Sequence, residues 1–340
     1  GRFSKIESSF RGSRSSLSVG DVNNDGHVDI FTTGYDKRVN PDPTAKLFLG
    51  NGDGSFSETD TGISGVGRFS DSAFGDVNND GNVDLVVVGA TNDTGSFGEE
   101  PSSVLYLGDG DGGFSEFSTN LTPVGGCCGK STADFHDVDD DGNLDLVITG
   151  QADFTATAAL YSGDGNGNFT RVGSDFSPVF EGVSGGSVDF GDINGDANTD
   201  VIVTGEEDYS GADESATIYI GDGTGDFTAA NTEITGVDDG DASFEDVNND
   251  GNLDLVITGN SGPFPESNEV AILYLGNGQG EFEQAEAGLT GASDSSVMFG
   301  DVDNDGDSDL FITGRNGSSD FSLTQTRKNF SRVYINRVVQ

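Results

Sequence analysis

Asp76-Val77-Asn78-Asn79-Asp80-Gly81-Asn82-Val83-Asp84 is a nine-residue stretch whose pattern occurs six times in the chain. The other copies span 21–29, 137–145, 192–200, 246–254 and 301–309. Oxygen-bearing side chains occupy positions 1, 3, 5 and 9, and position 6 is glycine in five of the six copies. Oxygen side chains at alternate positions, with a backbone carbonyl at position 7 and a glycine at the tight turn, are the ligand arrangement of a calcium loop.

Position 12 distinguishes these loops from EF-hand loops. An EF-hand needs a bidentate glutamate there and a helix on each side. Position 12 carries no carboxylate in any copy, and a strand-like apolar segment follows each loop; the residues are Thr32, Val87, Ile148, Val203, Ile257 and Ile312. We therefore expect about six Ca²⁺ ions, each bound in a loop between β-strands.

The predicted metal ligands follow one rule: side-chain oxygens at positions 1, 3, 5 and 9, and only the backbone carbonyl at position 7. In the first three copies they are Asp21, Asn23, Asp25, His27, Asp29; Asp76, Asn78, Asp80, Asn82, Asp84; and Asp137, Asp139, Asp141, Asn143, Asp145. In the last three they are Asp192, Asn194, Asp196, Asn198, Asp200; Asp246, Asn248, Asp250, Asn252, Asp254; and Asp301, Asp303, Asp305, Asp307, Asp309. The fourth copy has Ala197 at position 6, so we expect the weakest site there if that position requires a positive φ.

The repeat spacing predicts the fold. Successive copies start 55, 61, 55, 54 and 55 residues apart, which is the length of a supersecondary unit. In the fifth unit we expect strands at 242–247, 253–259 and 270–275, and a fourth that opens at Phe282. Both faces of such a sheet are apolar, so neighbouring sheets must cover it. This pattern predicts an all-β, six-bladed β-propeller of four-stranded antiparallel blades, a single domain over residues 1–340.

The two ends of the chain predict how the last blade is completed. Residues 332–336 match the third strands of the other units, and no fourth strand follows them. Residues 1–4 match the start of a fourth strand such as the one at 54–57. We therefore expect the N-terminal strand to close the last blade.

Phe74-Gly75 before the loop, the apolar run after it, and the later Leu-Tyr-Leu-Gly-Asx-Gly-x-Gly-x-Phe pattern together resemble the FG-GAP/VCBS repeat. That repeat forms the propeller of integrin α-subunits and of bacterial and archaeal surface proteins. The resemblance implies calcium loops on one face of the propeller, ligands on the opposite face, and an extracellular or cell-surface location. Integrin propellers have seven blades with calcium in only some, so the resemblance does not extend to integrin pairing.

The negative charge of the chain restricts the kinds of partner that it can bind. The formal net charge is −45, and six Ca²⁺ ions would leave about −33. Such a field repels nucleic acid and anionic membranes, and no apolar run is long enough to span a bilayer. Adaptation to high salt and an ordinary acidic secreted protein both explain the charge.

The sequence has two cysteines, Cys127 and Cys128, which are adjacent. The pair is compatible with a vicinal disulfide or with two thiols, and the oligomeric state stays open.

The loops between second and third strands vary in length and composition, and each carries an aromatic residue. These aromatic residues either fill their own loops or form a contact surface for a glycan or protein ligand. We expect a binding or adhesion module that is not an enzyme, since both histidines, His27 and His136, lie in or beside the loops. A polysaccharide lyase or hydrolase and a structural spacer are the alternatives. The candidate ligand-binding residues are Tyr35, Phe97, Tyr209 and Phe264.

We predict that salt stabilises the protein. With calcium held constant, raising NaCl from about 0.1 M to about 1 M shortens the screening length from about 10 Å to about 3 Å. Repulsion among the uncompensated carboxylates falls, so the melting temperature followed by circular dichroism should rise. A flat or falling melting temperature would argue against adaptation to high salt.

Overall fold

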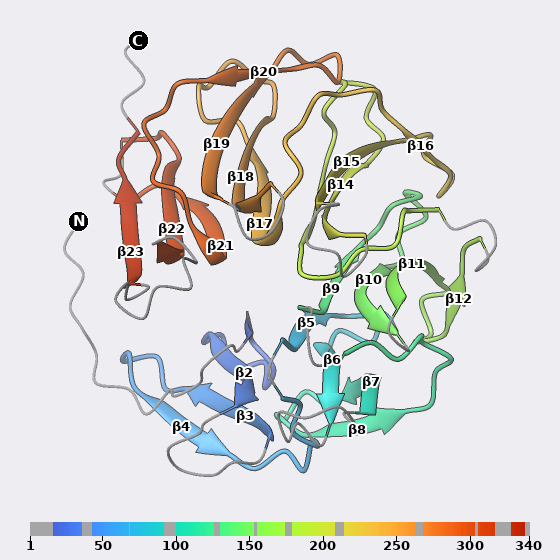
Figure 1. Ribbon diagram of the computed structural model, residues 1–340. Coiled ribbons are helices and arrows are strands. Elements are labelled where there is room, and N and C mark those ends of the chain that lie inside the picture. Colours follow the sequence, from blue (N-terminus) through green and yellow to red (C-terminus); the bar gives the residue numbers. More distant parts are fainter. Residues whose placement is uncertain are drawn as a thin grey trace. The chain divides into compact units, whose positions relative to one another are not determined.

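The computed structural model describes residues 16–35, 43–67, 69–91, 100–125, 130–152, 155–173, 179–207, 214–262, 268–302, 305–316 and 328–336. This part of the chain is all-β and contains no helix. Its strands form six antiparallel sheets, five with four strands and one with three, which are the blades of a β-propeller (Figure 1). The chain divides into an N-terminal unit with described residues in 16–184 and a C-terminal unit in 185–336. The all-β propeller prediction is confirmed, and the single domain stays a prediction.

The N-terminal unit holds blades 1 to 3. In each blade the strands follow the chain order across the sheet, and each pairs with the next through a short connection. Blade 1 comprises β1 (Leu17–Gly20), β2 (Asp29–Tyr35), β3 (Pro43–Gly50) and β4 (Phe56–Thr59); blade 2 comprises β5 (Asp71–Gly75), β6 (Asp84–Thr91), β7 (Glu100–Gly108) and β8 (Phe114–Phe117); blade 3 comprises β9 (Thr132–His136), β10 (Asp145–Ala152), β11 (Thr155–Gly163) and β12 (Phe169–Arg171).

The C-terminal unit holds blades 4 to 6. The last blade has three described strands, and residues 1–4, which we expected to close it, lie outside the described residues. Blade 4 comprises β13 (Val188–Gly191), β14 (Asp200–Glu206), β15 (Glu214–Gly221) and β16 (Phe227–Ala229); blade 5 comprises β17 (Asp238–Glu245), β18 (Asp254–Ser261), β19 (Asn268–Gly276) and β20 (Phe282–Ala285); blade 6 comprises β21 (Ser293–Gly300), β22 (Asp309–Asn316) and β23 (Lys328–Tyr334).

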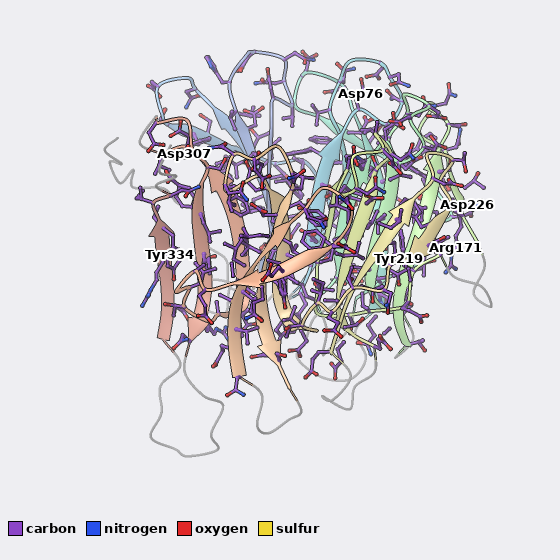
Figure 2. The ribbon with its side chains drawn as sticks, turned by 90° about the horizontal axis from the view of Figure 1, so that it is seen from above. Asp76, Arg171, Tyr219, Asp226, Asp307 and Tyr334 are labelled. Atoms are coloured by element: carbon purple, nitrogen blue, oxygen red, sulfur yellow. The ribbon has the colours of Figure 1, made fainter. Side chains whose placement is uncertain are left out.

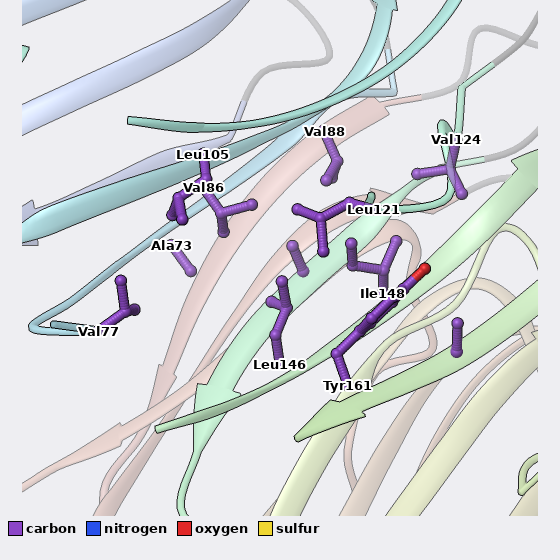
Figure 3. Packing of buried hydrophobic residues seen from close by; sticks show 12 residues of the cluster. Ala73, Val77, Val86, Val88, Leu105, Leu121, Val124, Leu146, Ile148 and Tyr161 are labelled. Atoms are coloured by element: carbon purple, nitrogen blue, oxygen red, sulfur yellow. The ribbon is translucent and has the colours of Figure 1, made fainter. Parts of the chain in front are cut away.

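The core of each unit lies between blades. The second strand of a blade is the most deeply buried: the first seven residues of β6 and of β10 are all buried. Figure 3 shows the cluster between blades 2 and 3, where Val86, Val88 and Leu105 face Leu146 and Ile148. Similar apolar clusters lie between blades 1 and 2, blades 4 and 5, and blades 5 and 6. Apolar burial between sheets therefore stabilises both units.

In blades 3, 5 and 6 the first strand has one edge without a partner in its own sheet, and a side chain of the preceding blade in the same unit accepts one of its N–H groups. The N–H of Ala242 donates to Ser187 Oγ at 2.9 Å, and the N–H of Val297 donates to Asp241 Oδ2 at 2.9 Å. In the N-terminal unit the N–H of Ala133 donates to Asp71 Oδ2 at 3.2 Å. Polar side chains of one blade thereby protect the exposed edge of the next.

A second contact between blades joins two buried hydroxyls. Thr33 of blade 1 and Ser70 of blade 2 have hydroxyl oxygens 2.9 Å apart, and Thr258 and Ser295 of blades 5 and 6 repeat this at 2.9 Å. In blade 2 the residue equivalent to the threonine is Val88. The residue of blade 3 that corresponds to Ser70 is Ser131, which is fully buried, and its Oγ has no hydrogen-bond partner among the described residues.

Val88→Thr should therefore stabilise the protein. Val88 is fully buried, and threonine has nearly the same shape as valine, so the new hydroxyl can pair with Ser131 Oγ as in the other two blade pairs. We expect the free energy of unfolding to rise by roughly 0.5–1.5 kcal/mol in urea denaturation. Val86→Thr is the matched control, since Val86 is also buried in this cluster; it should destabilise by roughly 1–3 kcal/mol. Equal losses in both variants would contradict the pairing.

Candidate metal centre

The loop between β5 and β6 shows how the nine-residue pattern folds. Both carboxylate oxygens of Asp76 accept backbone N–H groups, from Asp80 at 3.1 Å and from Gly81 at 2.9 Å. Asp80 Oδ1 in turn accepts the N–H of Asn82 at 2.8 Å. The chain thus curls around its own odd-numbered side chains, and their oxygens turn inward. Figure 2 shows Asp76 in this loop at the end of the blade.

The same hydrogen bonds recur in the other loops. Position 1 accepts the N–H of position 5 in all six, at 3.0–3.2 Å. Position 5 accepts the N–H of position 7 in all six, at 2.8–3.1 Å. The repeats therefore share one loop conformation as well as one sequence pattern.

Position 9 is buried, unlike the exposed tips of the loops. Asp84 is fully buried, and its Oδ2 accepts the N–H of Val77 at 3.0 Å while its Oδ1 accepts the N–H of Gly108 at 2.9 Å. Gly108 ends the third strand, so this carboxylate links the loop to the outer half of the blade. The equivalent residues, all at most 1% exposed, are Asp29, Asp145, Asp200, Asp254 and Asp309.

Burial raises the pKa of four position-9 carboxyl groups, those of Asp84, Asp145, Asp200 and Asp254. For Asp84 the pKa is raised to about 6, first by desolvation and then by the charges of Asp80 and Asp76, although two N–H donors lower it. Asp145, Asp200 and Asp254 are likewise raised to about 6. Carboxylates gathered this closely repel one another unless a cation neutralises them.

The third loop has the dimensions of a calcium site. Asp137, Asp139 and Asp145 each offer one carboxylate oxygen, and these oxygens lie within 4.8 Å of one another. Oxygens that bind one Ca²⁺ at 2.3–2.6 Å lie no more than about 5 Å apart, so the three fit a single ion. In loops 1, 2, 4 and 5 an asparagine oxygen takes the place of Asp139. These oxygen donors suit a hard cation, which would offset the mutual repulsion of the carboxylates.

Position 6 has a left-handed backbone in every loop. The glycines there have φ between 82° and 92°, and Ala197 in the fourth loop has φ 70°. The condition for a weak fourth site, a positive φ at position 6, is therefore met, and the weakness of that site stays a prediction. A Cβ atom added to these glycines would meet nothing within 4 Å, so the alanine is disfavoured by its backbone conformation and not by crowding. The fourth loop also has Gly195 at position 4, where asparagine or aspartate stands in loops 1, 2, 3 and 5.

Among the described residues, the structure brings predicted carboxylate ligands within 4.8 Å of one another in the third loop alone, at Asp137, Asp139 and Asp145, and Asp141 is not part of that group. The ligand sets of the other loops stay predictions, and Asp303 lies outside the described residues. Two features were missed from the sequence. Position 4 is also left-handed, for example Asn79 with φ 57°, and the asparagine and aspartate at this position were an available signal. The side chain of position 7 bridges to the neighbouring loop, as Asn143 does with Asn79 at 2.9 Å.

The candidate ligand-binding aromatics cannot be placed. Phe97, Tyr209 and Phe264 lie outside the described residues, and Tyr35 ends β2 without a described side chain. Cys127-Cys128 also falls outside the described part of the chain. The loops that carry the aromatics join β2 to β3 and its counterparts, at the ends of these strands away from the acidic loops.

Comparison with known sequences identifies the repeat. A family model described as FG-GAP-like repeat matches residues 21–87, 137–203 and 246–312, together more than half of the chain. The chain belongs to the FG-GAP-like repeat family. Each match begins at position 1 of a loop and ends in the second strand of the following blade, so the acidic loops are part of the family pattern. None of the curated proteins matches the sequence.

Solved structures with similar folds have diverse names. A rhamnogalacturonan lyase from Bacillus licheniformis is 15% identical with a TM-score of 0.49, over 88% of this chain and 55% of that one. A lectin from Aleuria aurantia in complex with Fucα1-6GlcNAc is 12% identical, TM-score 0.48, over 89% of both chains. The V. cholerae biofilm matrix protein Bap1 is 14% identical, TM-score 0.41, over 84% of this chain; the chain spans only 41% of Bap1. None of these likenesses carries a function over.

Ala197→Gly should stabilise the fourth loop. Glycine adopts the left-handed conformation without the penalty of about 1–2 kcal/mol that a Cβ atom adds, although its greater freedom in the unfolded chain offsets part of the gain. We expect the free energy of unfolding to rise by roughly 0.5–1 kcal/mol. Gly251→Ala in the fifth loop is the matched reverse change and should lower it by a similar amount. Chemical denaturation of both variants measures this, and a destabilised Ala197→Gly protein would contradict it.

Proposed function

We propose that the chain is a calcium-stabilised β-propeller that acts outside the cell as a binding or adhesion module. The observation that supports calcium most strongly is the set of carboxylate oxygens of Asp137, Asp139 and Asp145 within 4.8 Å of one another. The positions 1, 3, 5 and 9 of each loop would hold one ion, with the carbonyl of position 7. The bound ion would neutralise carboxylates that the fold holds together.

The calcium affinities typical of extracellular modules and the charge of the chain support an extracellular setting. Extracellular calcium modules bind at roughly 0.1–1 mM, a concentration of calcium that is met outside cells. A surface with net charge −45 stays soluble there and repels polyanions. Among the described residues, none forms a helix with the length and hydropathy to cross a membrane.

Chelation should destabilise the protein strongly. At about 10 mM free calcium, sites with affinities of roughly 0.1–1 mM each contribute about 1.4–2.7 kcal/mol if the unfolded chain binds none. Several such sites rival the whole stability of a typical domain. The melting temperature in EDTA should therefore fall sharply and recover when calcium is restored in excess, while magnesium restores little. An unchanged melting temperature in EDTA would contradict a structural role for calcium.

We propose that the ligand binds at the loops between second and third strands. The acidic loops have nearly the same sequence in every blade, whereas the loops at the other strand ends differ in length and composition. Variable loops held by a rigid scaffold are the usual place for binding. Aromatic side chains there can stack on sugar rings or anchor a protein segment. The negative field favours a neutral glycan or a basic or apolar protein segment over a polyanion.

Replacing the four candidate aromatics tests this site. The quadruple variant Tyr35→Ala, Phe97→Ala, Tyr209→Ala and Phe264→Ala should abolish retention on a glycan or cell-surface protein array. Its calcium-dependent melting temperature should stay close to that of the unchanged protein. Retention that survives the four changes would place the site elsewhere. Turnover of a glycan by the unchanged protein would favour the enzyme alternative.

A further inference from the structure

Three amide bridges connect acidic loops of neighbouring blades. The Nδ2 of Asn79, at position 4 of loop 2, donates to Asn143 Oδ1, at position 7 of loop 3, at 2.9 Å. The equivalent Asn24 donates to Asn82 Oδ1 at 3.1 Å between loops 1 and 2. In the C-terminal unit Asn249 donates to Asp307 Oδ1 at 2.6 Å between loops 5 and 6. Each bridge joins residues at least 58 positions apart in the sequence.

Each bridge reaches the residues proposed to bind the cation. Position 7 offers its carbonyl to the ion, and its N–H is held by the position-5 carboxylate: Asn143 N donates to Asp141 Oδ1 at 2.8 Å. The side chain of the same residue accepts the bridge from the preceding loop. An ion that holds the backbone of Asn143 therefore also positions the side-chain oxygen that accepts from Asn79. In the other direction, an ion that orders loop 2 positions Asn79, the donor.

The hairpin turn beside the bridge is shaped to leave room for it. A Cβ atom on Gly165, in the turn between β11 and β12, would lie 2.1 Å from Asn143 Oδ1 and 2.6 Å from Asn79 Nδ2. Gly110 has the same relation to the bridge between Asn82 and Asn24. Any larger residue at Gly165 would displace the amides, so the glycine keeps both groups of the bridge in place.

The pair of loops 4 and 5 lacks this bridge. Position 4 of loop 4 is Gly195, with φ 76°, and it has no side chain to donate. The acceptor on loop 5 is still in place. Asn252 Oδ1 lies 2.2 Å from where a Cβ atom on Gly278 would stand, and Asn143 Oδ1 has the same relation to Gly165 at 2.1 Å. A Cβ atom on Gly195 would have only an ordinary contact, 3.6 Å from the Gly278 carbonyl. The chain thus contains its own unbridged pair.

We propose that the amide bridges couple cation binding in neighbouring loops of one unit, so that an ion in one loop raises the affinity of the next. This inference rests on the proposed binding of calcium. Position-4 asparagines act as positioning residues: they touch no ion themselves and act through position 7 of the neighbour. A hydrogen bond of ordinary strength gives a coupling between about twofold and about tenfold in affinity. Thermodynamic linkage makes the effect equal in both directions.

Calorimetric titration of calcium into the ion-free full chain tests the coupling. The experiment is run in about 1 M NaCl, where screening weakens direct repulsion between ions and favours the folded ion-free protein. The loss-of-bridge variant combines Asn24→Gly, Asn79→Gly and Asn249→Gly, because glycine tolerates the left-handed backbone at these positions. Gly195→Asn is the gain-of-bridge variant. Asn166→Gly is the control, since within the described part of the chain the Asn166 side-chain amide donates to Asp164 of its own turn and not to a neighbouring loop.

The expected result separates coupling from simple structural support. The triple variant should bind as many ions as the unchanged protein but with a lower Hill coefficient. Gly195→Asn should raise the Hill coefficient. Asn166→Gly should leave it unchanged. Equal Hill coefficients in all four proteins, with equal ion counts, would overturn the coupling and leave the proposed calcium binding intact. No binding by the unchanged protein would overturn both. If the triple variant does not fold, Gly195→Asn decides, and an unchanged Hill coefficient there overturns the proposal.

Discussion

A carboxylate held between two backbone N–H groups joins every acidic loop to its blade. In blade 2 this is Asp84, which binds the N–H of Val77 within the loop and that of Gly108 at the end of the third strand. All six blades repeat the arrangement, with the Asn336 N–H in place of a glycine N–H in the last one. Because these carboxylates are buried, their charge is costly to maintain alone. We propose that an adjacent cation would offset this cost.

This arrangement divides the stability between two regions of each blade. Along the strands, apolar residues such as Val86 and Leu146 pack between neighbouring sheets and need no ion. At one end of the strands, the loops gather acidic and amide oxygens whose repulsion opposes folding. We infer that the cations act where apolar packing ends. We therefore expect the stability of this chain, with its net charge of −45, to depend on the ions around it.

The sequence predicted local features well and contacts between repeats poorly. The predicted strands 253–259 and 270–275 lie within or one residue outside β18 and β19, and β20 begins at Phe282 as expected. β17 (Asp238–Glu245) starts and ends earlier than the predicted 242–247, and a bulge lies between Asp238 and Asp241 in the part that was not predicted. The positive φ of Ala197 followed from a local pattern. The Asp84–Gly108 contact, the Asn79–Asn143 bridge and the unpaired Ser131 hydroxyl depend on residues 24 or more positions apart, and one sequence does not reveal such pairs.

The direct test of this account is the electron density in the six loops of crystals grown with calcium chloride. We expect one anomalous peak in each loop, bound by the oxygens of positions 1, 3, 5 and 9 and by the carbonyl of position 7, at the 2.3–2.6 Å typical of calcium. The position-9 carboxylates should keep both backbone N–H contacts beside the ion. Loops that keep the same conformation with only water between their carboxylates, in the presence of excess calcium, would contradict the account.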